Sequence, residues 1–130
     1  MLYRYIGTLL LLMMIQHPNQ ISLVHFESIE YPRLAWQARI DGEVKVEIHV
    51  ASDGSVSSAS ATSGHQLLQK AASDNVKKWV FLSNHESNLE IIYDFKLERP
   101  ESSSQHATTA IVDLPTRRVV VICNLPVLST

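Results

Sequence analysis

Two stretches of the chain alternate regularly between apolar and polar residues, and this alternation constrains the fold more than any other feature. Their apolar positions are Val44, Val46, Ile48 and Val50 in the first stretch, and Leu89, Ile91, Tyr93, Phe95 and Leu97 in the second. A period of two places successive side chains on opposite faces of a strand. Each stretch therefore predicts a strand with one buried face, and those faces need a second layer to cover them.

A helix between the two strands is predicted to supply that layer. The segment 63–81 carries an apolar stripe at helical spacing, formed by Leu67, Leu68, Ala71, Ala72, Val76, Trp79 and Val80. Ser63 and Gln66 fit a capping box at its start, and Lys77 and Lys78 near its end complement the helix dipole. A shorter helix is predicted near 32–38, because Pro32 suits a first helical turn.

The whole pattern predicts an α+β fold in two layers, a small antiparallel sheet packed on one main helix. The sheet comprises a hairpin of 44–50 with 56–62, joined at Asp53-Gly54, then a third strand over 89–97 and a fourth over Arg117–Cys123. The expected divisions are 1–20 for a signal peptide or short anchor, 21–30 for a lead-in, 31–98 for the domain, 99–116 for a flexible polar linker, and 117–130 for the C-terminal strand and tail.

The N-terminus predicts export to the periplasm or cell envelope. Arg4 precedes an apolar run from Tyr5 to Ile15. Its length of about eleven residues suits a signal peptide and falls short of the ~20 residues of a membrane-spanning helix. We expect membrane contact only through this segment, either transiently as a cleaved signal or as a short retained anchor.

Composition and spacing argue against nucleic-acid binding, catalysis and metal binding. The net charge is −2 with scattered cations, whereas a nucleic-acid surface needs clustered ones. Ser63 and His65 lack the G-x-S-x-G context of a nucleophile, and the six histidines show no zinc-ligand spacing. We expect no enzyme activity, no cofactor and no metal. Cys123 is predicted to be a small buried hydrophobe, with an intermolecular disulfide as the alternative.

Several short motifs, in order, resemble the C-terminal domain of the TonB energy-transducer family. They are Tyr31-Pro32, Ala35 with Ala38, Arg39-Ile40-Asp41-Gly42, the alternating strand 44–50, Asp53-Gly54, and Trp79 with Phe81. The resemblance covers roughly residues 31–98. It implies a periplasmic domain that binds an extended peptide of an outer-membrane transporter, or of another envelope protein, as an added strand at its sheet edge, and so contributes to TonB-dependent transport.

The resemblance also suggests where a partner would bind. The expected partner-binding residues are Tyr31, Pro32, Trp36, Ile91, Tyr93 and Phe95. For Tyr31 and Pro32 a purely structural role as a helix start is the competing interpretation.

Two departures from the family favour a second hypothesis. Only about ten residues, the lead-in 21–30, separate the N-terminal segment from Tyr31 instead of a long spacer, and ten extended residues span only ~35 Å. The fourth strand could also occupy the edge of the third strand. The alternative is therefore a structural or self-associating envelope domain, a homodimer included, whose sheet edge is sealed by its own C-terminal strand.

Overall fold

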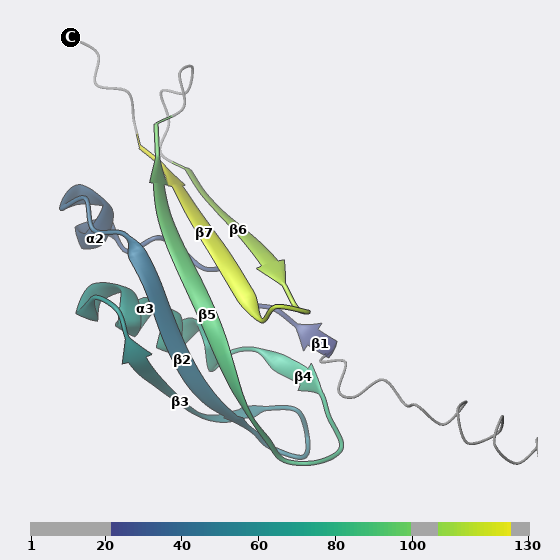
Figure 1. The fold of residues 1–130 in the computed structure, drawn as a ribbon. Helices are drawn as coiled ribbons and strands as arrows, with labels where there is room; N and C mark the ends of the chain where they lie inside the picture. The colour runs from purple at the N-terminus through teal and green to yellow at the C-terminus, as the bar shows by residue number, and fades with distance from the viewer. Residues whose placement is uncertain (1–21, 100–106, 126–130) are drawn as a thin grey trace, which may run out of the picture.

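The computed structural model describes residues 22–99 and 107–125 (Figure 1). Its elements are β1 Ser22–His25, α2 Arg33–Gln37, β2 Gly42–Val50, β3 Val56–Ser63, α3 Gln66–Val76, β4 Val80–Leu82, β5 Ser87–Glu98, β6 Ala107–Asp113 and β7 Arg118–Asn124. The signal peptide or anchor expected over 1–20 lies outside these residues. Within the described ranges, neither helix is long and apolar enough to cross a membrane.

Five strands form the main sheet, in the order β3-β2-β5-β7-β6, and β1 pairs with β4 in a separate two-stranded sheet. All neighbours are antiparallel except β5 and β7, which run parallel. The predicted α+β fold is confirmed, with a mixed sheet in place of a wholly antiparallel one. The reason is the order of the last two strands, because β6 takes the outer position and β7 returns between it and β5 (Figure 1).

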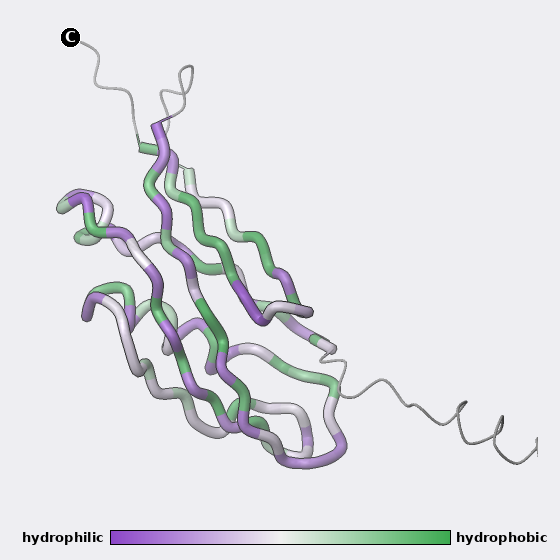
Figure 2. Tube along the Cα trace, viewed as in Figure 1, coloured by the Kyte–Doolittle hydropathy of each residue, from purple (hydrophilic) through white to green (hydrophobic). Residues whose placement is uncertain are grey.

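The two alternating stretches form the adjacent central strands β2 and β5, as their pattern predicts. They pair from Gly42 opposite Phe95 to Val50 opposite Ser87. The alternation of apolar and polar residues is visible along both strands (Figure 2). Their apolar residues face α3, which packs on the β2–β3 half of the sheet and buries Leu68, Ala72 and Val76. The segment between β1 and α2 covers the same face further along, behind β5 and β7 (Figure 1).

The main helix starts later and ends earlier than the sequence predicts, and the capping box is wrong. Ser63 belongs to β3, where its hydroxyl accepts a hydrogen bond from the Lys45 N–H at 3.3 Å. His65 caps α3 instead, because its Nδ1 accepts the Leu67 N–H at 3.2 Å. At the other end Trp79 is buried beyond the last turn, and the chain continues as β4 to pair with β1.

Two segments without predicted strands form strands. The lead-in 21–30 contains β1, and the linker expected over 99–116 contains β6 at 107–113. β6 pairs with β7 along its whole length, from Ala107 opposite Asn124 to Asp113 opposite Arg118. Its β-branched residues Thr108, Thr109, Ile111 and Val112 favour extended backbone, and the ladder with β7 pairs the backbone groups on one side of the strand. The rest of the expected linker, residues 100–106, lies outside the described residues.

Candidate functional site

The outer edge of β5 is filled by the chain's own strand β7. The two strands pair in parallel from Ile92 opposite Arg118 to Glu98 opposite Asn124. On the core side of β7, Val119, Val121 and Cys123 have no exposed surface. β7 is therefore part of the hydrophobic core, and the edge that the sequence singled out is not open to a partner in this structure.

A group of charged side chains crosses the solvent face of these strands. Arg118 of β7 lies 3.2 Å from Glu43 of β2 and 3.7 Å from Asp94 of β5, both measured between its Nη1 and a carboxylate oxygen. Lys96 lies 3.7 Å from Asp94. The side chain of Arg118 is 37% exposed, so each pair contributes less than about 1 kcal/mol. Their effect is to favour this register of β7 over one shifted along β5.

The hydrogen bonds at the two ends of the β5–β7 ladder define which way each backbone group of β7 points. The Ile92 N–H donates to the Arg117 carbonyl at 2.9 Å, and the Leu125 N–H donates to the Glu98 carbonyl at 2.8 Å. Alternate residues of a strand direct both their N–H and C=O to the same neighbour. Positions 119, 121 and 123 therefore bond to β5, and positions 118, 120, 122 and 124 face β6.

The register between β6 and β7 then identifies the backbone groups at the open edge. The β7 positions that face β6 pair with Ala107, Thr109, Ile111 and Asp113, whose N–H and C=O groups consequently point back at β7. Thr108, Ala110 and Val112 direct theirs away from the sheet. Because β6 ends the strand order, no strand of the described chain pairs with these groups.

The two edge strands of the sheet differ in how well they could accept another strand. β6 is regular over seven residues, contains no Lys, Pro or Gly, and has Ile111 54% exposed on the solvent face. β3 is rich in serine, and its pairing with β2 is interrupted by two register shifts. Bulges and irregularity protect an edge, whereas a flat apolar edge invites pairing. β6 is therefore the better candidate.

Four of the six predicted partner-binding residues are core residues. Tyr31, Ile91, Tyr93 and Phe95 are each at most 3% exposed. The Tyr31 ring meets Phe95 edge-on at 5.4 Å, and its hydroxyl donates to the Ile40 carbonyl at 2.6 Å. Burial raises the pKa of Tyr31, so the hydroxyl stays a donor.

The other two predicted residues, Pro32 and Trp36, are half-buried in and beside α2. The structure brings Tyr31 together with Phe95. The Tyr31 N–H also donates to the Thr108 Oγ1 of β6 at 3.5 Å, so the segment that leads into α2 reaches the core side of β6. The partner role of all six residues stays a prediction.

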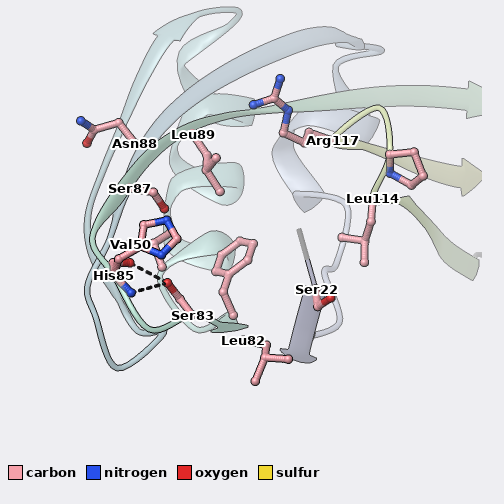
Figure 3. Close-up of a pocket in the computed structure, with 12 residues that line it drawn as sticks. Ser22, Val50, Leu82, Ser83, His85, Ser87, Asn88, Leu89, Leu114 and Arg117 are labelled. Carbon is pink, nitrogen blue, oxygen red and sulfur yellow. Dashed lines mark hydrogen bonds between the residues drawn. The ribbon is translucent and has the colours of Figure 1, made fainter. Parts of the chain in front are cut away.

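A cleft of about 760 Å³ lies at the end of the sheet near the β6–β7 turn (Figure 3). Its apolar lining includes Val50, Phe81 and Leu89, and Leu114 and Arg117 belong to the turn. The Ser83 hydroxyl beside it donates to the His85 carbonyl at 2.6 Å, which gives that serine a structural role in the loop. Among the described residues, no three His, Cys, Asp or Glu side chains gather as metal ligands.

Comparison with known proteins identifies the family. Residues 27–97 match the family described as Gram-negative bacterial TonB protein C-terminal. The chain belongs to the TonB C-terminal family. Domains of this family are periplasmic and are not enzymes, which confirms the prediction that the chain has no catalytic activity.

The fold agrees with a solved TonB C-terminal domain. The solution NMR structure of the Pseudomonas aeruginosa TonB C-terminal domain matches with a TM-score of 0.55 and 23% identity, over 67% of this chain and 95% of that chain. At this identity the match shows the fold alone. No curated protein matches the sequence. Strands β6 and β7 lie outside the residues that match the family.

The outer strand β6 is the part of the candidate site that sequence reasoning missed. The polar residues at 101–106 just before it led to the prediction of a flexible linker over 99–116. The signal that could have found it is the run of β-branched residues before Pro115, followed by the apolar strand after Arg117. Two such runs joined by a short turn indicate a hairpin.

Proposed function

We propose that this TonB C-terminal domain works in the cell envelope, where it binds an extended segment of an outer-membrane transporter or of another envelope protein. The segment is added as a strand to the sheet, and the binding contributes to TonB-dependent transport. The family supports the class of partner. The open edge of β6 supports the mode of binding, because Thr108, Ala110 and Val112 offer main-chain donors and acceptors to an added strand.

The β6 edge is a better site for the added strand than the β5 edge. A peptide could reach β5 only by displacing β7, which would expose Val119, Val121 and Cys123. Exposing three such side chains costs on the order of 5–9 kcal/mol. Addition to β6 leaves the core intact.

One observation favours a second function, that of a structural domain with a sealed edge. β7 completes the core and pairs with β5 over seven residues. In this alternative the C-terminal hairpin closes the family's sheet permanently, and the chain binds no peptide.

Peptide binding to the full chain separates the two functions. Labelled peptides from the N-terminal segments of the same organism's outer-membrane transporters are titrated with the wild type, Ala110→Pro and Ala110→Ser, and binding is followed by fluorescence anisotropy. Proline removes the outward N–H, whereas serine keeps it. We expect binding by the wild type and the serine variant, and at least about tenfold weaker binding by the proline variant, the cost of one or more hydrogen bonds.

Hydrogen exchange locates the added strand. Peptide binding at β6 slows exchange of the Thr108, Ala110 and Val112 amides and leaves the amides of Val119 and Val121 protected. Failure of every peptide to bind the full chain contradicts the proposed function and favours the sealed structural domain. Loss of protection at Val119 and Val121 on binding places the peptide at β5 instead.

A further inference from the structure

We propose that two copies of this chain pair through β6, antiparallel about a two-fold axis beside Ala110, to make one continuous sheet. This inference goes beyond the peptide-binding function and does not depend on it. It starts from the outer strand, which lies outside the residues that match the family. The occupant that we infer for the β6 edge is a second copy of the same strand.

The backbone of β6 is complementary to itself. The outward positions Thr108, Ala110 and Val112 are evenly spaced and symmetric about Ala110. In an antiparallel pair centred there, Ala110 lies opposite Ala110 of the second copy, and Thr108 lies opposite Val112. These are the hydrogen-bonded pairs, because these residues direct their N–H and C=O groups outward. Every outward group of the strand then has a partner.

The side chains of β6 also fit their symmetry mates. On the solvent face Ile111 lies opposite Thr109 of the second copy, and Asp113 lies opposite Ala107. β-Branched residues opposite one another stabilise a strand pair, and like charges opposite one another destabilise it. The strand's single charge, on Asp113 at its end, faces no like charge. The pairing also covers Ile111, which is 54% exposed in one copy.

The apolar character of the neighbouring strand extends this surface. Val120 and Ile122 of β7 are half-buried on the same solvent face, beside Ile111 and Thr109. β7 is the most continuously apolar strand of the sheet (Figure 2). In a dimer joined at β6, the apolar residues on the solvent face of β6 and β7 in each copy lie at the centre of the joined sheet. The charged residues of β2 and β5 lie further out. A seven-residue strand pair is smaller than the interface of a permanent dimer, so we expect a reversible dimer.

Sedimentation equilibrium of the full chain tests the dimer, over protein concentrations from roughly 10 μM to 1 mM. The variants are Ala110→Pro, which removes the central outward N–H, and Ile111→Lys, which places a charge on the apolar edge. Ser60→Lys adds the same charge to the opposite edge strand β3, where Ser60 is exposed, and is the matched control. We expect a dimer mass for the wild type and Ser60→Lys, and a monomer mass for both β6 variants.

Circular dichroism tests whether each variant is folded. If Ala110→Pro is not folded, the mass of Ile111→Lys decides the outcome. A wild type that stays monomeric at about 1 mM overturns the proposal. Dimers that persist in folded Ile111→Lys also overturn it. Every variant keeps the N-terminal apolar segment, so association through that segment would survive in the β6 variants and count against the proposal. Peptide binding is not measured, so the result is independent of the proposed function.

Discussion

Asn75 shows how one side chain can join parts of the chain that lie far apart in sequence. Its Oδ1 accepts hydrogen bonds from the Trp79 Nε1–H at 2.9 Å and the Tyr93 hydroxyl at 2.8 Å. Its Nδ2 donates to the carbonyls of Glu27 at 2.9 Å and Ser28 at 3.2 Å. The residue is 6% exposed. It connects the end of α3 to β5 and to the segment that leads into α2.

Replacing Asn75 with alanine should destabilise the domain strongly. The substitution leaves the buried Trp79 and Tyr93 donors without acceptors, and each such group costs about 1–3 kcal/mol. We expect the free energy of unfolding in urea to fall by roughly 2–5 kcal/mol. The exposed Asn84 offers a control, because Asn84→Ala should change it by less than about 0.5 kcal/mol. Equal effects of the two substitutions would contradict the structural role of Asn75.

The sequence predicted residue roles well where the signal is local. Burial of Trp79 and Cys123 is confirmed, because each lies in an apolar stripe or strand. Burial also raises the pKa of the Cys123 thiol, which keeps it in its unreactive form. The role of Asn75 could not be predicted, because the groups it bonds lie up to 48 positions away. The contact between Tyr31 and Phe95 is likewise non-local, so the sequence does not indicate that each ring is buried against the other.

At the scale of elements, periodicity predicted β2 and β5 because each carries its own burial pattern. The apolar run before Pro126 predicted β7 as a strand, but its parallel place beside β5 depends on contacts made across the intervening residues. The alternation in β6 is weak, since Thr108 and Ala110 are the residues that face the core side. Strand existence is a local property in this chain, whereas strand order is not.

The contribution of β7 to the core can be measured against that of β2. Val121 in β7 and Val46 in β2 both have no exposed surface, but only Val46 lies within the residues that match the family. We expect Val121→Ala and Val46→Ala each to lower the free energy of unfolding by roughly 2 kcal/mol, through the lost methyl groups and the cavity left behind. Chemical denaturation provides the measurement.

A much smaller loss of unfolding free energy for Val121→Ala than for Val46→Ala would show that β7 is not a core strand. If Val121→Ala costs less than about 0.5 kcal/mol while Val46→Ala costs the expected amount, the C-terminal hairpin is a separate and weakly attached unit. The β5 edge would then open at low cost, and the preference for a partner strand at β6 would lose its energetic basis.

At the scale of the whole molecule, the C-terminal hairpin places two strands, β7 and β6, beyond the last strand that lies within the family match. The matched residues end at 97, within β5, and β7 and β6 follow it in the sheet. A partner strand and a second copy of the chain would both use the backbone groups of Thr108, Ala110 and Val112. One edge cannot hold both, so peptide binding and dimerisation are expected to exclude each other.

This competition gives a prediction that neither proposal makes alone. Adding a transporter peptide that binds the chain should convert the dimer into a complex of one chain with one peptide, because each peptide strand occupies one β6 edge. Sedimentation velocity at a concentration where the dimer predominates follows the conversion, and Ser60→Lys should behave as the wild type. A dimer that takes up two peptides without dissociating would show that the two ligands use different edges. In that case the peptide strand must pair elsewhere, at β3 or in place of β7, and the protection of the Val119 and Val121 amides distinguishes these two sites.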